Sequence, residues 1–251
     1  MSRITNSLPY QSAVVTGASS GIGRAVTRRL VGEGLRVHAI DRDAEQLKSL
    51  ARECDVETTV IDLQDTTRLA ELFMREEIDV VVNNAGVLPG TGKFGERPET
   101  DIDLMLDINL RAPLHIAHMA LQGMLERKRG HLFFVGSSAG RYPHPNCAGY
   151  SATKAGISMF CDALRCDLLG SGVRVTEIAP GRVQTHFYRT ALGDTTAKEK
   201  LYDGYRSIQP EHIAELIGRA MTLPDYVDVS RIEVFPTDQA AGGSQIVSYE
   251  Q

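Results

Sequence analysis

Short apolar segments rich in branched residues alternate along this chain with longer amphipathic segments. Residues 22–33 repeat apolar side chains at helical spacing, whereas residues 78–82 are almost all apolar, as in a strand buried on both faces. The same reading predicts seven strands, at residues 12–16, 35–40, 57–61, 78–82, 131–135, 173–178 and 231–235. Helices are predicted between most of them, at residues 22–33, 44–53, 66–77, 100–129, 148–169 and 210–222.

This alternation predicts an α/β protein with a doubly wound Rossmann fold. We expect one domain over residues 1–251, built on a seven-stranded parallel sheet with helices on both faces. The long helix over residues 100–129 is expected to bend at Pro113. Residues 87–99 and 182–207 lack periodicity and follow strand ends, where doubly wound folds bind ligands. The second segment is therefore a candidate substrate lid.

Composition narrows the function without selecting one. The chain of 251 residues is 42% hydrophobic and 24% charged, and its net charge of −5 argues against a nucleic-acid partner. No apolar run approaches the ~18 residues of a membrane span. Residues 1–11 lack the basic and then apolar pattern of a signal peptide, so we expect a cytoplasmic protein without a membrane partner.

The cysteines do not predict a metal site. None of the four forms a Cys-x-x-Cys pair, and no histidine cluster accompanies them; they are Cys54, Cys147, Cys161 and Cys166. Free thiols in a reducing compartment are the simpler interpretation, and we expect no bound metal.

A glycine-rich segment follows the first predicted strand. Gly17, Gly21 and Gly23 have the spacing Gly-x-x-x-Gly-x-Gly, between that strand and a predicted helix. Glycines in this context allow a tight turn and a close approach of backbone to a pyrophosphate. The helix that follows offers its free amides and positive dipole end to the phosphates. The segment therefore predicts a dinucleotide site.

Asp41 ends the second predicted strand, eighteen residues after Gly23. A carboxylate there binds the two adenosine ribose hydroxyls of NAD and repels the 2′-phosphate of NADP. Arg42 follows directly and is able to hold a 2′-phosphate. NAD is the favoured prediction, NADP is the alternative, and a turn or helix cap before Ala44 is the structural interpretation of Asp41.

Tyr150 and Lys154 lie one helical turn apart in the predicted helix 148–169. An ammonium beside a phenol favours the phenolate, so the pairing predicts a tyrosine pKa lowered toward neutral. Such a phenol is a candidate general acid/base. The spacing by itself is equally compatible with an ordinary surface pair.

Further motifs follow the glycine loop in a fixed order. They are Asn83-Asn84-Ala85-Gly86 after the fourth strand, Asn109, Ser137, the pair Tyr150 and Lys154, and Pro180-Gly181 after the sixth strand. Together with the glycine spacing they resemble the short-chain dehydrogenase/reductase family, in its single-domain branch of about 250 residues. The resemblance covers nearly the whole chain, and it implies an oxidoreductase that uses a nicotinamide cofactor.

The resemblance implies a role for each motif residue. Tyr150 would exchange the proton with the substrate oxygen, and Ser137 would bind and polarise that oxygen. Lys154 would lower the pKa of Tyr150 and bind the nicotinamide ribose, and Asn109 would hold a water behind Lys154. Cofactor contacts would come from Gly17, Ser19, Ser20, Gly21, Ile22, Gly23, Asp41, Arg42, Asp62, Leu63, Asn83, Ala85, Gly86, Tyr150, Lys154, Pro180, Gly181 and Val183.

Substrate identity is the least determined feature. The C-terminal end, residues 231–239, resembles the branch acting on serine and related hydroxy acids, and also some carbonyl reductases, several of which prefer NADP. His144 and Arg189, with Ser137, are substrate-pocket candidates. The alternatives are an NADP-dependent carbonyl or hydroxy-acid reductase and a non-catalytic cofactor-sensing regulator. The family also implies a homo-oligomer, a tetramer or dimer, formed through the helices at 100–129 and 148–169.

Overall fold

The computed structural model describes residues 8–75, 77–193, 205–242 and 246. Its centre is one parallel sheet of seven strands, in the order β3-β2-β1-β4-β5-β6-β7. The predicted seven-stranded, doubly wound Rossmann fold is thereby confirmed. The strands are β1 (Ser12–Thr16), β2 (Arg36–Asp41), β3 (Glu57–Val60), β4 (Val80–Asn83), β5 (Gly130–Val135), β6 (Val173–Pro180) and β7 (Arg231–Val234).

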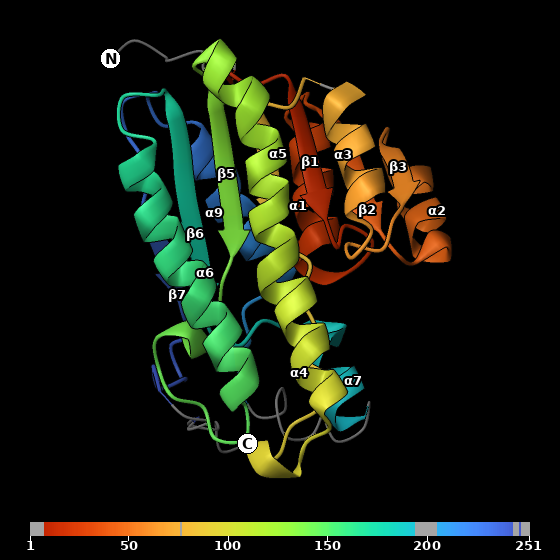
Figure 1. Ribbon diagram of the computed structural model, residues 1–251, viewed down its shortest axis with the longest axis vertical. Coiled ribbons are helices and arrows are strands. Elements are labelled where there is room, and N and C mark those ends of the chain that lie inside the picture. The colour runs from red at the N-terminus through yellow and green to blue at the C-terminus, as the bar shows by residue number, and fades with distance from the viewer. Residues whose placement is uncertain (1–7, 76, 194–204, 243–245, 247–251) are drawn as a thin grey trace.

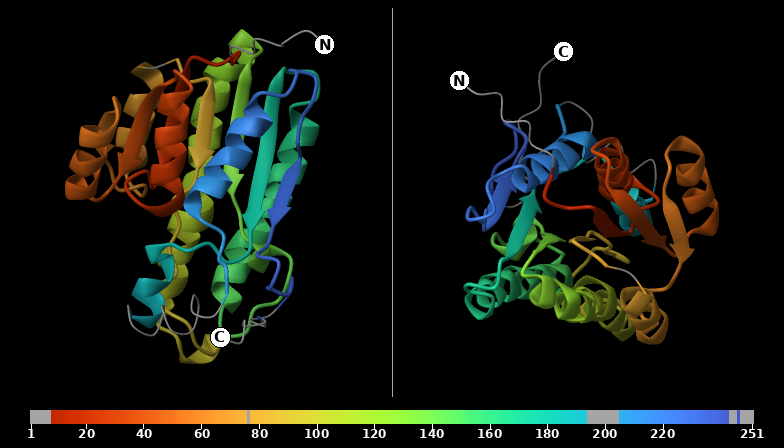
Figure 2. Two further views of the ribbon diagram at one scale, coloured as in Figure 1. Left: turned by 180° about the vertical axis from the view of Figure 1, so that it is seen from behind. Right: turned by 90° about the horizontal axis from the view of Figure 1, so that it is seen from above.

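Helices cover both faces of the sheet, which gives the three layers seen from above in Figure 2. One face carries α1 (Gly21–Gly32), α2 (Ala44–Glu53) and α9 (Pro210–Met221). The other carries α3 (Thr66–Arg75), α5 (Ala112–Arg127) and α6 (Ala148–Asp167). A short α4 (Glu99–Leu106) continues the line of α5 beyond the sheet (Figure 1).

Each layer is held by apolar side chains that the sequence period places on one side. Val26 and Leu30 of α1 are fully buried against one face of the sheet, and Ile116 of α5 is fully buried against the other. The α2 helix begins where Asp43 accepts a hydrogen bond from the Gln46 amide at 3.0 Å, an N-cap that satisfies one free donor. Among the described residues, no helix combines the length and apolarity that crossing a membrane requires.

The predicted long helix over residues 100–129 is interrupted before Pro113 rather than bent at it. A π-helical turn, η2 (Asp107–Arg111), joins α4 to α5, and the Ala112 amide donates to the Asp107 carbonyl. Pro113 has no amide hydrogen for the carbonyl of Asn109 four residues earlier, so the regular α-helical ladder cannot continue there. The wider turn places Asn109 at the inner side of the helix, where its side chain is buried.

Candidate active site

The motif residues meet at the carboxyl ends of the strands, at the lower end of the sheet in Figure 1. Ser137 follows β5, and Pro180 ends β6. Tyr150 and Lys154 lie in the first two turns of α6, and Asn109 comes from η2. Residues from the middle and the second half of the chain therefore converge at the carboxyl ends of the strands, where β1 leads into the glycine loop.

Tyr150 and Lys154 form a buried pair rather than a surface pair. Their relative exposures are 8% and 4%, and the Lys154 Nζ atom lies 5.8 Å from the centroid of the Tyr150 ring. Nζ also donates a hydrogen bond to the Val135 carbonyl at 2.8 Å. This burial distinguishes the two residues from the solvated pair that the spacing also allowed.

The prediction of a lowered tyrosine pKa is wrong for this arrangement. Burial raises the pKa of Tyr150, the neighbouring Tyr188 raises it further, and a hydrogen bond with Ser137 lowers it only in part. Burial also lowers the pKa of Lys154 to about 8. For Tyr150, burial is therefore the dominant influence on the pKa and outweighs the hydrogen bond with Ser137.

Ser137 and Ser138 point to different partners. Ser137 hydrogen-bonds Tyr150, and its Oγ accepts from the Ala139 amide at 3.1 Å, which begins the short helix η3 (Ser138–Gly140). Ser138 is buried, and its Oγ lies 3.4 Å from Nε2 of His144. Of the two serines, Ser137 is the one that faces the candidate acid/base, as the spacing predicts.

Asn109 is fixed beside the lysine. Its Oδ1 accepts from the Val87 amide at 2.7 Å, and its Nδ2 donates to the Val87 carbonyl at 2.9 Å. Gly86 lies between the two side chains: a Cβ there would come within 3.4 Å of Asn109 Oδ1 and 3.7 Å of Lys154 Nζ. A glycine at this position keeps the space between Asn109 and Lys154 open.

The glycine loop has the geometry of a pyrophosphate cradle. Gly17 has a φ of 62°, and a Cβ there would come within 2.9 Å of Ala85 Cα. A Cβ on Gly23 would come within 2.1 Å of the Gly17 carbonyl oxygen, so only glycine fits at the start of α1. Within the described part of the chain, the amides of Gly21, Ile22 and Gly23 have no acceptor, and Ser20 caps none of them. These free donors fit a dinucleotide's phosphates.

At the adenosine end, Asp41 is held in place by the glycine loop. Its Oδ2 accepts from the Ser19 amide at 3.0 Å and the Ser19 hydroxyl at 2.7 Å. Arg42 beside it is exposed. Asp62 is also exposed and caps its own turn through the Gln64 amide, whereas the Leu63 side chain is buried in the core. If Leu63 meets an adenine, it does so through its backbone.

The two asparagines after β4 behave differently. Asn84 ties the glycine loop to β4, since its Nδ2 donates to the carbonyls of Thr16 and Gly17 at 3.0 and 3.1 Å. The Asn83 side chain is buried, and both of its amide atoms lack a hydrogen-bond partner within the described residues. The Ala85 amide donates to Thr16 Oγ1 at 3.2 Å, and this hydrogen bond fixes the position of Ala85.

The segment after β6 packs against the glycine loop. The Gly181 amide donates to the Val234 carbonyl at 2.7 Å, and Val183 is buried. Thr185 is not among the sequence-predicted cofactor residues, yet a Cβ on Gly21 would come within 3.2 Å of Thr185 Cγ2. Its position four residues after Gly181 was the available indication.

A small hollow of about 20 Å³, partly open to solvent, borders Tyr150. Its wall is largely apolar, with Leu88, Phe94 and Met105 contributed by the β4–α4 connection and α4. Arg97 also lines it, in an ion pair with Asp101, and the Arg97 Nε atom is buried without a partner in the described structure. Arg97 is not among the sequence-predicted pocket residues, because its loop lacks a recognisable motif.

The structure describes the two other substrate-pocket candidates, His144 and Arg189, to different extents. His144 is half-buried, and burial and the nearby Arg182 lower its pKa. Arg189 begins the short helix α7 (Arg189–Leu192), which follows η4 (His186–Tyr188), and its side chain is outside what the structure describes. Residues 194–204 of the predicted lid lie outside the described residues as well.

The described part of the chain contains no cluster of His, Cys, Asp or Glu side chains suited to a metal ion. All four cysteines are free thiols.

Comparison with known proteins places this geometry in a known context. The family model described as short chain dehydrogenase matches residues 11–195. An uncharacterised short-chain type dehydrogenase/reductase of Sinorhizobium fredii is 51% identical over 237 residues, which is 94% of this chain and 96% of that protein. The NADP-dependent 3-hydroxy acid dehydrogenase of Salmonella typhi is 35% identical over 242 residues, covering 93% and 98%.

Solved structures show the same similarity to hydroxy-acid dehydrogenases. The closed form of a serine dehydrogenase complexed with NADP⁺ superposes with a TM-score of 0.89 and 32% identity, over 96% of this chain and all of that one. The family resemblance and the likeness to hydroxy-acid dehydrogenases are thereby confirmed. These relatives use NADP, so they do not support the expected preference for NAD.

Proposed function

The chain belongs to the short-chain dehydrogenase family, and from that premise we propose that it transfers a hydride between a nicotinamide cofactor and a small hydroxy acid or its carbonyl counterpart. One observation carries the proposal. Ser137 hydrogen-bonds the buried Tyr150 hydroxyl and Lys154 lies beside the Tyr150 ring, at the same carboxyl ends of the strands as the glycine cradle. A surface pair or a non-catalytic sensor does not require this convergence.

The proposed mechanism divides the work among the four residues. When bound, the nicotinamide supplies or accepts the hydride. Tyr150 donates its proton to a carbonyl oxygen, or takes one from a hydroxyl, and Ser137 hydrogen-bonds the same oxygen. Lys154 would bind the nicotinamide ribose from its place beside the Tyr150 ring. Asn109 would hold a water behind Lys154, and Pro113 has no amide hydrogen to donate to the Asn109 carbonyl.

The chain's own residues would hold the cofactor along the sheet edge. The free amides at the start of α1 would bind the pyrophosphate. Asp41 would accept hydrogen bonds from the adenosine ribose. Gly86, beside Asn109 and Lys154, would leave room for the nicotinamide half.

NAD remains the proposed cofactor, and Asp41 supports it. At about 4 Å and an effective dielectric near 20, each like-charge pair between this carboxylate and a 2′-phosphate costs about 4 kcal/mol. NADP is the second candidate, because Arg42 is exposed next to Asp41 and the characterised relatives named above use NADP. Binding of NADH and NADPH, followed by fluorescence at several salt concentrations, separates the two.

The proposed substrate class is supported by the relatives and by the hollow beside Tyr150. A small hydroxy acid matches the names of the hydroxy-acid and serine dehydrogenases. Arg97 brings a positive charge to the lining of that hollow, although Asp101 shares it. The test is formation of NADH or NADPH with a panel of hydroxy acids, simple alcohols, sugars and steroids. Turnover of neutral alcohols alone would contradict an acidic substrate.

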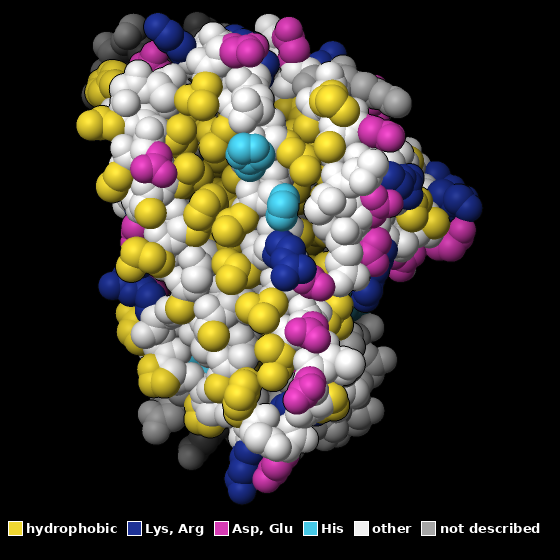
Figure 3. Space-filling view, viewed as in Figure 1, with side chains coloured by type: hydrophobic (Ala, Val, Ile, Leu, Met, Phe, Trp, Pro, Cys, Tyr) yellow, Lys and Arg dark blue, Asp and Glu magenta, His cyan; other side chains and the backbone are white. Residues whose placement is uncertain are grey.

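We also propose a homo-oligomer formed through α5 and α6. Apolar side chains gather on the face that these helices present in Figure 3, and Leu125 and Met159 on them are 43% and 67% exposed. A cytoplasmic location and a single domain with a lid at about 182–207 complete the proposal. The free thiols support the location, because they are typical of a reducing compartment.

A further inference from the structure

A buried carboxylate lies on β6, the strand beside β5, whose last residue binds the candidate catalytic lysine. Glu177, in the middle of β6, is 2% exposed. Register pairs it with Phe134 of β5, so its side chain points to the face of the sheet that α6 covers. Its Oε1 lies against Gly136, where an added Cβ would come within 2.3 Å of it. Gly136 stands between Val135, whose carbonyl binds Lys154, and Ser137.

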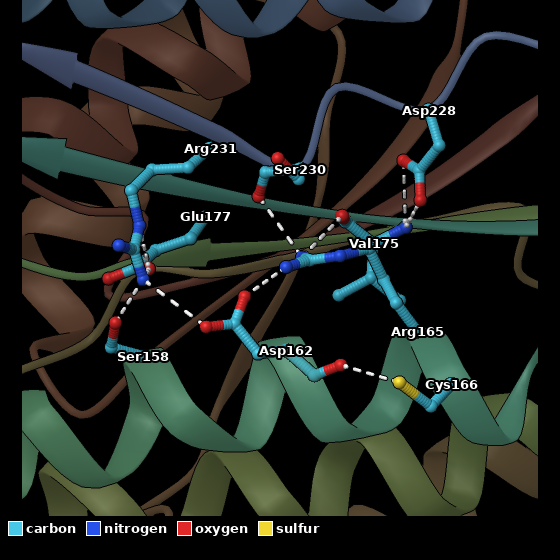
Figure 4. A network of polar contacts seen from close by, with 9 residues as sticks. All are labelled: Ser158, Asp162, Arg165, Cys166, Val175, Glu177, Asp228, Ser230 and Arg231. Atoms are coloured by element: carbon cyan, nitrogen blue, oxygen red, sulfur yellow. Dashed lines mark hydrogen bonds and ion pairs between the residues drawn. The ribbon is translucent and has the colours of Figure 1, made fainter.

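Arg231 holds this carboxylate in place. Its Nε and one terminal nitrogen both lie 2.7 Å from Glu177 Oε2, so Oε1 is the oxygen turned toward Gly136. The same terminal nitrogen donates to Ser158 of α6, one turn after Lys154, and lies 3.9 Å from Asp162. Figure 4 shows Arg231 reaching from β7 across Glu177 to the helix. Oε2 of Glu177 is therefore paired with Arg231, whereas Oε1 presents negative charge on the side of Gly136.

Burial of an ammonium is costly unless an opposite charge lies nearby. The groups packed around Lys154 come from several elements. Tyr150 lies on its own helix, β5 offers the Val135 carbonyl, η2 offers the Asn109 amide, and β6 offers Glu177. Beyond Glu177 lie Arg231 and Asp162. In the described structure, Glu177 is the charged group whose field opposes the effect of burial on the pKa of Lys154.

We propose that Glu177 is a positioning residue for the active site: its carboxylate, oriented by Arg231 and seated against Gly136, keeps Lys154 in the ammonium form. The inference rests on the proposed function for the role of Lys154. It assigns a task to a buried carboxylate that the four motif residues leave unused. The competing interpretation is that the pair only fastens α6 to the sheet.

The test is a direct titration of Lys154 in the intact protein. The chain has six lysines, so ¹³Cε labelling of lysine gives few resonances, and loss of one in Lys154→Arg identifies it. In the wild type we expect a midpoint near 8, below that of the exposed lysines. In Glu177→Gln the midpoint should fall by about one further pH unit, as expected for loss of a nearby opposite charge.

Matched variants separate charge from fastening. Ser158→Ala removes the hydrogen bond of Arg231 to α6 and leaves the carboxylate, so its midpoint should equal that of the wild type. The double variant Glu177→Gln, Arg231→Gln leaves no buried unpaired guanidinium, and its midpoint should fall in the same direction by a smaller amount. If Glu177→Gln does not fold, the double variant replaces it as the test. An unchanged midpoint in whichever of the two folds, or an equal fall in Ser158→Ala, would overturn the proposal.

The titration needs neither cofactor nor substrate, so it fails independently of the proposed function. A shifted midpoint in a protein that oxidises no hydroxy acid would leave the Glu177–Lys154 coupling intact and remove its catalytic meaning. Activity together with an unshifted midpoint would remove the role of Glu177 alone. Where activity is found, the alkaline limb of kcat/KM in Glu177→Gln should move to lower pH by the same amount as the titration.

Discussion

The Asp41 carboxylate is bound to the glycine loop by Ser19, whose amide and hydroxyl both donate to Oδ2, at 3.0 and 2.7 Å. Its Oδ1 accepts from the Asp43 amide at 3.1 Å. The negative charge at the end of β2 is therefore fixed in position, and a ligand carrying a phosphate at the adenosine ribose would meet it. This relationship makes the cofactor preference testable at a single residue.

Replacing Asp41 with Ala should raise the use of NADP relative to NAD. Removal of the carboxylate eliminates repulsion of a 2′-phosphate and also a ribose acceptor, so NAD should weaken while NADP improves. The ratio of the two kcat/KM values should change at least tenfold, which corresponds to about 1.4 kcal/mol. Glu45→Gln, which removes an exposed charge of the same sign from α2, is the matched control. A ratio that moves equally in both variants would mean that Asp41 does not meet the ribose.

Replacing Tyr150 with Phe should remove most turnover and leave cofactor binding near normal. The variant keeps the buried ring beside Phe187 and deletes the hydroxyl that hydrogen-bonds Ser137. Loss of a positioned general acid/base lowers kcat by about 10²–10⁴-fold. Steady-state kinetics and NADH fluorescence measure the two quantities, and Tyr226→Phe, at a residue 85% exposed, should change neither. Full activity in the Tyr150 variant would refute the assignment.

Two glycines of α1 give opposite predictions for the same substitution. Gly23→Ala places a Cβ within 2.1 Å of the Gly17 carbonyl oxygen, so the loop must shift, which should cost roughly 1–3 kcal/mol of stability and abolish cofactor binding. Gly32→Ala meets no atom within 4 Å and should raise stability by about 0.5–1 kcal/mol. Urea unfolding with and without cofactor distinguishes them, and similar effects at both positions would contradict the cradle geometry.

The buried His131 should make the protein less stable in mild acid. Burial lowers its pKa well below 6.5, and Arg174 lowers it further. Below pH 6.5 the unfolded chain therefore takes up a proton that the folded protein does not. The free energy of unfolding should fall by about 1.4 kcal/mol per pH unit from this residue alone.

His131→Phe keeps the stacking with Phe133 and loses the contact with Thr176. It should start less stable by about 1 kcal/mol, and its unfolding free energy should fall less steeply from pH 6.5 to 5.5. His118→Gln on the exposed side of α5 should keep the wild-type slope. Urea unfolding at pH 7.5, 6.5 and 5.5 gives the slopes, and parallel slopes in the wild type and His131→Phe would contradict the prediction.

Met159→Glu should dissociate the proposed oligomer. Met159 is 67% exposed on α6, and a carboxylate buried without a partner in an interface costs several kcal/mol. Light scattering after size exclusion should show a smaller species for this variant. Met74→Glu on α3, at a residue 78% exposed, should keep the wild-type mass. A monomeric wild type would remove the proposal altogether.

Local patterns were enough to predict most of the fold. The predicted helix over residues 44–53 coincides with α2, and the strand over residues 12–16 coincides with β1, because apolar period and flanking caps are properties of adjacent residues. The prediction of a bend at Pro113 was less accurate, because the irregular turn lies at Asp107–Arg111. Proline indicates that the helical ladder must fail, but how the helix accommodates the failure depends on packing against the strands and α6.

The same division applies to the active site. Spacing along the chain indicates the family, because the glycine loop, Asn109, Ser137, Tyr150 and Lys154 occur in a fixed order at characteristic separations. The electrostatics of the site depend instead on how the chain packs. Burial raises the pKa of Tyr150, where local reasoning predicted a fall, and packing lets the charge of Glu177 act on Lys154 across twenty-three positions of the chain. Spacing sets which side chains share a helical face, whereas exclusion of water and charges from other strands exist only once the chain is packed.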